Sequence, residues 1–350
     1  MKQSPVIMKV LRDPIGAVSL AYIIVVFFIA LFASKLAPDF SENANQMHVS
    51  IHSKPPGFTT KLLIIPSQDG SVLEEIPVVA TRWEETQLFY QTEAMGKNYE
   101  VPLDRNNFPL EMTPSQIEQE YVVERTFYWG TDKFGRDLLS RMIFGSRISL
   151  SIGFIAVFIS LFIGVLLGGL AGFLGGKTDQ VMVWLINVMW SIPSLLMVIA
   201  ITLALGKGYW QVFIAVGLTM WVDVARLVRG QVISIKEQPY IQAAHILSFS
   251  SISIFFKHIF PLLIPALIVI STANFASAIL IESGLSFLGI GAQPPIPSWG
   301  GMIKDHFRYI LLGKAYLAVI PGVAIMSLVL AFMLLGNSLR DAMDVKNYSH

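Results

Sequence analysis

Few residues in this sequence stand in an arrangement that could do chemistry. Residues 171–178 read AGFLGGKT, one residue away from a phosphate-binding loop. Alanine holds the first glycine position, however, and an apolar run precedes the segment where such a loop needs a strand to aim its N–H groups at phosphate. His245 and His258 have no third plausible metal ligand beside them, and no serine lies in a G-x-S-x-G sequence. We therefore expect that this chain has no ATP site, no metal site, no bound cofactor and no catalytic nucleophile. We also expect no enzymatic activity in this chain.

A second polar segment, residues 238–261, lies between two apolar stretches and carries polar or cationic side chains such as Gln242 and His258. Ala243 and Ala244 are small enough for a short helix to lie close against a partner. A polar loop on the cation-rich side of a membrane protein is a plausible docking surface for a soluble partner.

Three polar residues fall within or beside a later apolar stretch. Charged groups inside a membrane are costly and usually face a cavity or a partner. Glu282 with Ser283 is therefore interpreted either as a polar lining or gate, or as an interfacial carboxylate that caps the backbone of residues 283–284. Asn274 either lines the same path or makes an ordinary hydrogen bond between helices.

Four glycines repeat at intervals of four residues, at Gly164, Gly168, Gly172 and Gly176. This spacing places them on one face of a helix, where the missing side chains let another backbone approach closely. The pattern predicts a tight contact between two membrane helices. The alternative is that glycine is merely tolerated there.

The composition is that of a membrane protein. The chain has 350 residues, of which 54% are hydrophobic and only 14% charged, with a mean hydropathy of +0.61. Soluble domains usually carry about 25% charged residues, so lipid must cover much of this surface. The net charge of +1 argues against binding to nucleic acid. The absence of cysteine excludes disulfides and thiolate metal sites.

Six stretches are candidates to cross a bilayer core about 30 Å thick, which takes about 20 helical residues. They are residues 15–33, 148–173, 181–205, 211–224, 259–281 and 316–335. The first could be taken for a signal peptide, but its apolar core of about 19 residues exceeds the roughly 7–15 of such a peptide, which favours an uncleaved helix. The fourth is short because Asp223 and Arg226 interrupt it, and the alternative is that it extends to Val228 with both charges at the interface.

Cations near the N-terminus, between the fourth and fifth spans (Arg226, Arg229, Lys236 and Lys257) and near the C-terminus predict that both termini are cytoplasmic. Asp132 with Arg136, and Asp137 with Arg141, are spaced to pair along one face of an interfacial helix. β-Branched and aromatic runs before that helix predict a strand-containing insert. The expected division is a cytoplasmic N-terminus with the first helix at 1–35, an extracytoplasmic insert at 36–129, an interfacial amphipathic segment at 130–147, a five-helix core at 148–340 and a cytoplasmic tail at 341–350.

Residues 240–261 resemble the cytoplasmic EAA loop of ATP-binding-cassette (ABC) importer permeases, whose pattern is approximately E-A-A-x-x-x-G, nine further residues, and I-x-L-P. Gln242-Ala243-Ala244 takes the first three positions, Ser248 the glycine position, and residues 259–261 (IFP) the end. Gln242 replaces the family's glutamate and Ser248 its glycine, so position 242 offers no carboxylate for a charge pair with an ATPase.

Three further segments resemble the dipeptide, oligopeptide and nickel branch of that family, and together they cover about residues 130–344. They are the run from GTDKFGRD at 130–137 to GSRISL at 145–150, the sequence ESGLSFLG at 282–289 followed by PPIPSWG at 294–300, and LRDAMD at 339–344. The Arg-Asp-Pro sequence at 12–14, before the first span, also resembles the start of this family.

The resemblance implies an all-α polytopic protein with six transmembrane helices in the type I ABC importer permease fold, here carrying the strand-containing insert. The implied partners are a second homologous permease, usually a different chain, two cytoplasmic ATPase subunits that hold ATP and Mg²⁺, an extracytoplasmic binding protein or lipoprotein, and membrane lipid. The coupling residues that it implies are Tyr240, Gln242, Ala243, Ala244, Leu247, Ser248, His258 and Pro261. Asn274, Glu282 and Ser283 are the candidates for a path between the two permeases.

The expected function is that of a multi-pass permease subunit in a bacterial cytoplasmic membrane, which imports peptides. The same machinery importing nickel or another small solute, an ion-driven secondary transporter and an intramembrane enzyme are the alternatives. We also expect the insert at 36–129 to contact the delivering binding protein, with a structural role between the permeases as the alternative.

Overall fold

The computed structural model describes residues 6–66, 72–84, 87–94, 97–109, 112–206 and 208–343. The parts of the predicted N-terminus and C-terminal tail at 1–5 and 344–350 lie outside these residues. The chain divides into two compact units. The helical unit comprises residues 1–31, 145–304 and 319–350, and the strand unit comprises residues 32–144 and 305–318.

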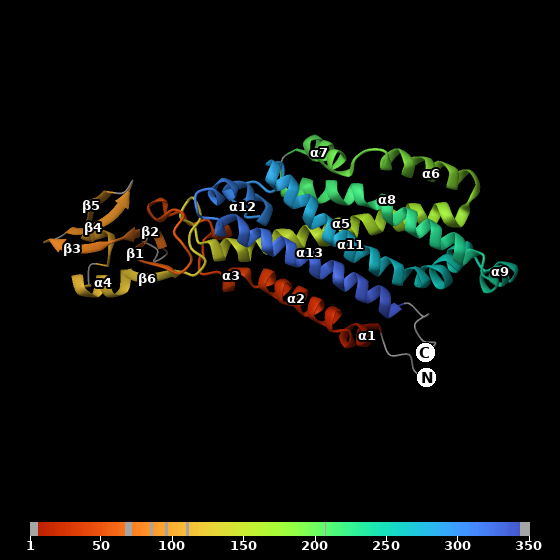
Figure 1. The fold of residues 1–350 in the computed structure, drawn as a ribbon, viewed down its shortest axis with the longest axis horizontal. Helices are drawn as coiled ribbons and strands as arrows, with labels where there is room; N and C mark the ends of the chain where they lie inside the picture. Colours follow the sequence, from red (N-terminus) through yellow and green to blue (C-terminus); the bar gives the residue numbers. More distant parts are fainter. Residues whose placement is uncertain are drawn as a thin grey trace. The chain divides into compact units, whose positions relative to one another are not determined.

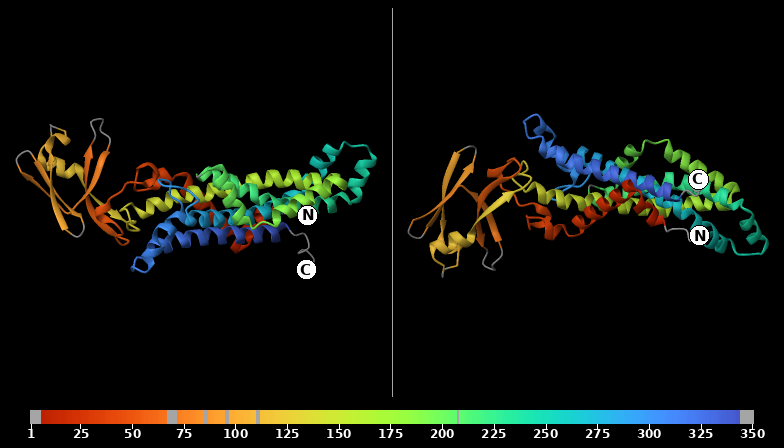
Figure 2. Two further views of the ribbon diagram at one scale, coloured as in Figure 1. Left: turned by 90° about the horizontal axis from the view of Figure 1, so that it is seen from above. Right: turned by 60° about the horizontal axis from the view of Figure 1, so that its bottom comes forward.

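Long apolar helices make up most of the helical unit, and α5, α8, α11 and α13 run side by side within it (Figures 1 and 2). Helices α5 and α13 each begin in the strand unit. The helices are α1 (Val6–Arg12), α2 (Pro14–Leu31), α5 (Leu138–Leu174), α6 (Gly176–Trp190), α7 (Ser194–Leu205), α8 (Tyr209–Lys236), α9 (Pro239–Ile246), α10 (Ser251–Ile254), a π-helical turn (Phe255–Ile259), α11 (Phe260–Leu288), α12 (Trp299–His306) and α13 (Tyr316–Met343).

Within the described residues, five helical segments are long and apolar enough to cross a membrane, or six if α6 and α7 together form one broken span. The span predicted at 181–205 is not one continuous helix, because α6 and α7 meet at a bend of 90°. Pro193 lies at this break and supplies no backbone N–H to continue the helix. It also disfavours helical geometry at the residue before it.

The fourth predicted span, 211–224, is too short. Helix α8 continues through Asp223 and Arg226, and beyond the alternative end at Val228, to Lys236. Asp223 is exposed at the surface of this chain. The guanidinium of Arg226 stacks over the ring of Trp190 on α6, with its carbon 3.6 Å from the ring centroid. Because Asp223 is exposed and Arg226 stacks on an aromatic ring, neither charge ends the helix.

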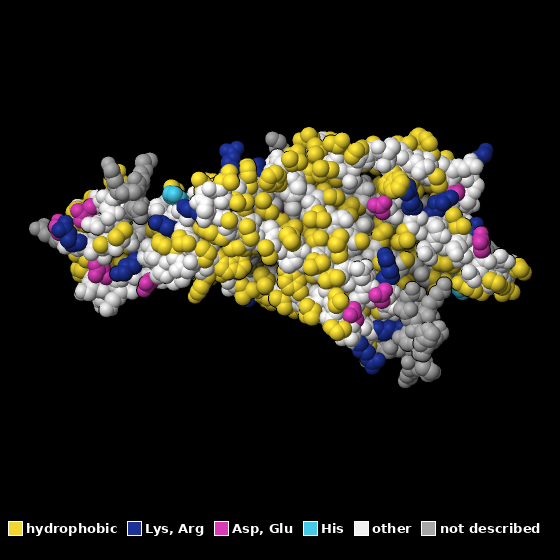
Figure 3. All heavy atoms as spheres, in the orientation of Figure 1, with side chains coloured by type: hydrophobic (Ala, Val, Ile, Leu, Met, Phe, Trp, Pro, Cys, Tyr) yellow, Lys and Arg dark blue, Asp and Glu magenta, His cyan; other side chains and the backbone are white. Residues whose placement is uncertain are grey.

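Close packing joins the long helices. Phe213 of α8 and Ile152 of α5 are almost wholly buried in one apolar cluster with Ala278 of α11. Phe275 of α11 stacks on Phe332 of α13, with ring centroids 4.0 Å apart. Since lipid tails are as apolar as these side chains, van der Waals packing rather than water exclusion stabilises such contacts within a bilayer. Hydrophobic side chains also cover the middle of α11 and α13 on the face that Figure 3 shows, as a lipid-facing surface requires.

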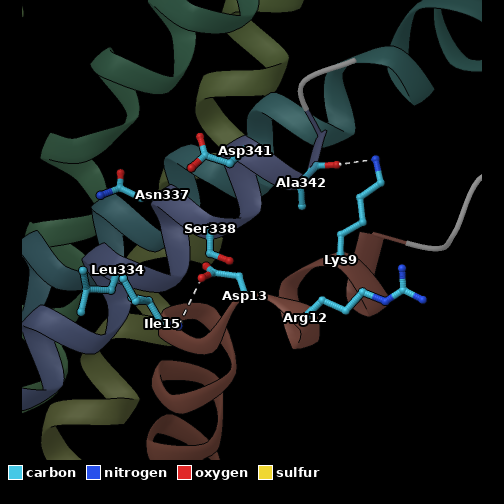
Figure 4. Close-up of a pocket in the computed structure, with 9 residues that line it drawn as sticks. All are labelled: Lys9, Arg12, Asp13, Ile15, Leu334, Asn337, Ser338, Asp341 and Ala342. Atoms are coloured by element: carbon cyan, nitrogen blue, oxygen red, sulfur yellow. Dashed lines mark hydrogen bonds between the residues drawn. The ribbon is translucent and has the colours of Figure 1, made fainter. Parts of the chain in front are cut away.

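Helix α1 and the start of α2 lie beside the last turns of α13 (Figure 4). The Asp13 carboxylate caps α2 by accepting hydrogen bonds from the backbone N–H groups of Ile15, at 3.2 Å, and Gly16, at 3.1 Å. The ammonium group of Lys9 donates to the Ala342 carbonyl at 3.0 Å. A hollow of about 540 Å³ lies between these residues and the end of α13. Helix α1 and the last turn of α13 therefore lie on the same side of the bundle.

The strand unit confirms the prediction that the insert contains strands. Its strands are β1 (Phe58–Pro66), β2 (Val72–Val78), β3 (Ala80–Glu84), β4 (Gln87–Ala94), β5 (Lys97–Asp104) and β6 (Val122–Phe127), with short helices α3 (Ala33–Leu36) and α4 (Pro114–Tyr121). Two antiparallel three-stranded sheets form, in the orders β2-β1-β6 and β3-β4-β5. Leu63, Val78, Leu88, Phe108 and Ile117 are buried between the sheets and α4.

The interfacial helix predicted at 130–147 is wrong in its first half. Gly130 and Gly135 have φ angles of +79° and +74°, which a right-handed helix excludes. Residues 130–137 therefore form a turn, in which Arg136 donates from Nε to the Asp132 carboxylate at 2.6 Å. Helix α5 begins only at Leu138 and continues directly into the span.

The predicted pair between Asp137 and Arg141 is also wrong. The Asp137 carboxylate instead accepts hydrogen bonds from the backbone N–H and the hydroxyl of Ser140 at the start of α5. Burial raises the pKa of Asp137, and this effect outweighs the hydrogen bonds from Ser140 that lower it. Arg141 turns to Asp132, with its Nε 3.8 Å from the carboxylate. The carboxylate of Asp137 is thus used to begin a helix.

Candidate functional site

The loop predicted at 238–261 contains two short helices, α9 and α10, held against the end of α8. Ile241 is fully buried, and Ala244 is 7% exposed, in a cluster with Val228 and Val232 of α8. Ala243 lies on the other side of α9 and is exposed. Of the two alanines expected to face a partner, Ala244 thus packs within this chain, and Ala243 remains on the surface.

Five large apolar residues between positions 239 and 254 of this loop are exposed. We define them as the loop patch, which consists of Tyr240, Ile246, Leu247, Phe249 and Ile252. Leu247 is 71% exposed and Ile246 is 83% exposed. Contiguous exposed apolar residues at a helix–loop end usually mark a contact surface. Gln242 lies beside the patch, exposed, and its side-chain amide donates to the Glu237 carbonyl at 3.2 Å.

Ser248 ends α9 in the left-handed conformation, with φ at +60°. The backbone N–H of Leu247 donates to the Ala243 carbonyl, and that of Phe249 donates to the Ala244 carbonyl. A left-handed residue just after a helix commonly satisfies its last carbonyl groups, and glycine takes this conformation without a steric cost. The glycine position of the EAA pattern therefore has a backbone reason in this chain, although serine holds it.

Replacing Ser248 with glycine should stabilise the loop, whereas valine should destabilise it. A non-glycine residue in the left-handed region costs about 1 kcal/mol, and a β-branched residue costs more. Part of the gain on placing glycine is offset by the greater freedom of the unfolded chain. Amide hydrogen exchange of residues 241–249 is expected to slow in Ser248→Gly and to quicken in Ser248→Val. Equal exchange in both variants would contradict the role of this conformation.

His258 and Pro261 lie where the loop joins α11. His258 is half-buried within the π-helical turn, and its ring meets the edge of the Phe249 ring at 6.4 Å between centroids. Pro261 occupies the first turn of α11, where its missing N–H would be unpaired in any case. The two residues thus shape the connection from the loop patch to the α11 span. Single π-helical turns are frequent at functional sites.

Three of the four predicted glycines bring α5 against α8. A β-carbon at Gly168 would lie 2.8 Å from the Ala225 Cα, and one at Gly172 would lie 2.9 Å from the Arg229 carbonyl oxygen. One at Gly164 would lie 2.5 Å from the Val224 Cβ. The prediction is wrong for Gly176, which begins α6 with φ at +55° and has no atom near its β-carbon position. The chain has already left α5 at Leu174.

Glu282 is buried inside α11, with 1% of its surface exposed. Its carboxylate accepts a hydrogen bond from the Ser286 hydroxyl at 2.6 Å, and the Ser298 hydroxyl donates to Ser286 Oγ at 3.1 Å. The capping interpretation is wrong, because α11 continues to Leu288 and ends at Gly289, with φ at +83°. Ser286 lies one turn after Glu282, so helical spacing could have indicated this pair, but Ser298 reaches it through a loop.

Ser283 and Asn274 stand apart from this hydrogen-bonded group. The hydroxyl of Ser283 and the side-chain NH₂ of Asn274 are both buried without a hydrogen-bond partner among the described residues. Ser283 follows Glu282 directly, whereas Asn274 is 6% exposed and lies two turns earlier on α11. The structure thus brings Ser286 and Ser298 to Glu282, two residues that sequence alone did not group with it.

Known proteins of similar sequence include a protein family and several individual permeases. Residues 164–346 match the family model described as "Binding-protein-dependent transport system inner membrane component". The dipeptide transport system permease protein DppC of Alkalihalophilus pseudofirmus is 38% identical over 246 residues, which are 70% of this chain and 80% of the relative. The oligopeptide transport system permease protein OppC of Escherichia coli (strain K12) is 41% identical over 64% of this chain and 74% of its own length.

The glutathione transport system permease protein GsiD of Shigella flexneri is 41% identical over 63% of this chain and 72% of its own length. A solved chain titled as an inward-facing conformation of the MetNI methionine ABC transporter aligns with a TM-score of 0.49 at 17% identity. It covers 59% of this chain and 98% of that chain.

Proposed function

Because the chain belongs to the family of binding-protein-dependent inner-membrane transport components, it is a multi-pass permease subunit of an ABC importer, and we propose that it forms half of a peptide path coupled to separate ATPase subunits. A second homologous permease would supply the other half of the path. ATP and Mg²⁺ would be held by the ATPase subunits. The loop patch carries this proposal.

The proposed coupling starts from the position of the loop patch. Ile241 and Ala244 tie α9 to the end of α8, so a force applied at Leu247 reaches a membrane helix through buried contacts. A ligand shifts a conformational equilibrium only if it binds the two states differently. We infer that closure of the ATPase dimer on ATP moves α9 and favours one orientation of the path. Residues 240–261 would then lie on the cytoplasmic side, together with both termini.

Cross-linking tests this docking directly. The chain has no cysteine, so Leu247→Cys introduces a single thiol. We expect this thiol to cross-link to an ATPase subunit in membranes that hold the whole complex. Leu311→Cys is the matched control, since Leu311 is 91% exposed in the strand unit. Cross-links from position 311 and none from position 247 would overturn the proposed orientation.

Peptides are the proposed cargo. The relatives named above are permeases for dipeptides, oligopeptides and glutathione, all of which contain peptide bonds. Nickel or another small solute is the alternative cargo of the same machinery. Ion-driven secondary transport is a separate alternative, and it predicts sensitivity of uptake to an ionophore at constant ATP.

We propose that the strand unit contacts the delivering binding protein on the extracytoplasmic side. Phe58 of β1 pairs with Phe127 of β6, so the two ends of the segment 59–126 lie next to each other. Replacing them with a short glycine–serine turn should remove both sheets without stretching the chain.

We expect this excised variant to assemble with its partners while its affinity for the binding protein falls about tenfold or more, since interface energy concentrates in a few contacts. Binding of the purified binding protein to the detergent-solubilised complex measures this. An unchanged affinity would reject the proposal and favour a structural role for the insert.

A further inference from the structure

Helix α8 carries a polar stripe that no other described residue of this chain covers. From Thr219 to Ala225 every residue except Asp223 is buried. Three exposed residues follow it toward the end of α8, and helical periodicity places them near its face. We define the α8 stripe as Asp223, Gly230, Gln231 and Ser234.

The three cations of α8 are directed away from this stripe. Arg226 stacks on Trp190 of α6, and Arg229 forms a two-fold ion pair with Asp179 of α6, at 2.5 Å and 2.7 Å. Lys236 donates to the Phe173 carbonyl of α5 at 2.7 Å. Asp223 has no hydrogen bond or ion pair within the part of the chain that the structure describes. Among the four charged residues of α8, the exposed and unpaired one is therefore a carboxylate.

Asp223 lies at a position along α8 that falls within the depth of the hydrocarbon core. The helix begins with Tyr209 and Trp210, aromatic residues of the kind that line membrane interfaces. With a rise of 1.5 Å per residue, Asp223 lies about 20 Å along the axis from Tyr209, within a hydrocarbon core about 30 Å thick. An exposed carboxylate at such a depth has to face a water-filled cavity or a partner, because contact with lipid is too costly.

We propose that the α8 stripe lines the translocation path and that Asp223 recognises a positively charged group of the cargo, such as the ammonium group of a peptide. This inference rests on the proposed function and names a specificity-determining residue for it. The chemistry is charge complementarity, because a carboxylate in a narrow aqueous path raises the local concentration of cations. Holding the three α8 cations against α5 and α6 preserves that negative potential.

The first test asks whether the stripe meets water, and it does not depend on transport. Single cysteines are placed at Asp223, at Ser234 and at Phe158, a residue that is 71% exposed on the apolar surface of α5. In the assembled complex, a charged thiol reagent should label positions 223 and 234 at least about tenfold faster than position 158, since thiolates form only in water. Labelling of position 223 no faster than that of position 158 would overturn the proposal.

The second test measures whether Asp223 favours cargo that carries a positive charge. Uptake of a tripeptide with a free amino group is compared with uptake of its N-acetylated form, in vesicles that hold the full complex with its binding protein. In Asp223→Asn, the ratio of the two rates should fall about three- to fivefold, the range of a solvated ion pair. The control, Asp341→Asn, removes another exposed carboxylate, at the end of α13, and should keep the wild-type ratio.

Two outcomes would overturn the role of Asp223. One is an unchanged ratio in Asp223→Asn, and the other is loss of the partner permease on purification, which would make Asp223 an ion-pair partner between subunits. Wild-type uptake that does not depend on ATP would instead contradict the proposed function. The labelling of position 223 would still decide whether the α8 stripe faces water.

Discussion

Replacing Gly168 with leucine is expected to disrupt the packing of α5 against α8, and so to lower the temperature at which the bundle unfolds. A β-carbon there would overlap the backbone of Ala225, whose Cα lies 2.8 Å away. Backbone atoms inside a helix cannot swing aside as a flexible side chain does, so the helices must separate. Overpacking of this kind costs about 1–3 kcal/mol and occasionally more, and leucine at a backbone contact should fall at the upper end.

The measurement is thermal unfolding of the purified protein in detergent, together with its level in membranes. Gly322→Ala in α13 is the control, because no atom lies within 4 Å of its β-carbon position. Alanine there should be neutral or should stabilise the helix by up to about 1 kcal/mol. Unfolding of Gly168→Leu at the wild-type temperature would show that α5 and α8 do not pack as described.

Replacing Leu247 with aspartate is expected to leave the bundle folded and to reduce ATP-driven uptake at least about tenfold, because one residue at the centre of an interface often carries this much binding energy. Leu247 is 71% exposed, so the substitution removes little packing within this chain. A buried carboxylate without a partner opposes docking of the ATPase. Recovery of the ATPase subunits with the tagged permease should fall in parallel with uptake.

Leu311→Asp provides the matched comparison for this variant. Leu311 is an equally apolar residue, 91% exposed at the end of a short helical turn in the strand unit, and its substitution should leave ATPase recovery unchanged. If Leu247→Asp retained its ATPase subunits and its uptake, the loop patch would not be the docking surface.

Hydropathy was sufficient to find the membrane spans, because about 20 apolar residues have few other uses in a protein of this composition. It could not locate the bend at Pro193, since proline may begin, kink or end a helix, and packing decides which. Asp223 and Arg226 were mistaken for the end of a span for a related reason. The contact between Arg226 and Trp190 joins residues of two helices and has no signature in local sequence.

Local pattern predicted the strands of the insert, whereas their pairing depends on contacts between distant residues. Strand β1 pairs with β6, which follows more than 50 residues later in the sequence, after the strands of the second sheet and α4. At the candidate site, family resemblance led to Ser248, and its left-handed backbone gives the physical reason. Spacing alone was misleading at Gly176, because a helix must continue through a repeat for its members to share a face, and α5 ends first.

The most direct test of the proposed function is uptake by vesicles that contain this chain with its partner permease, with or without the ATPase subunits. We expect peptide uptake that requires both the ATPase subunits and hydrolysable ATP, and that persists when an ionophore dissipates the ion gradients. Uptake that continues without the ATPase subunits and collapses with the ionophore would contradict it.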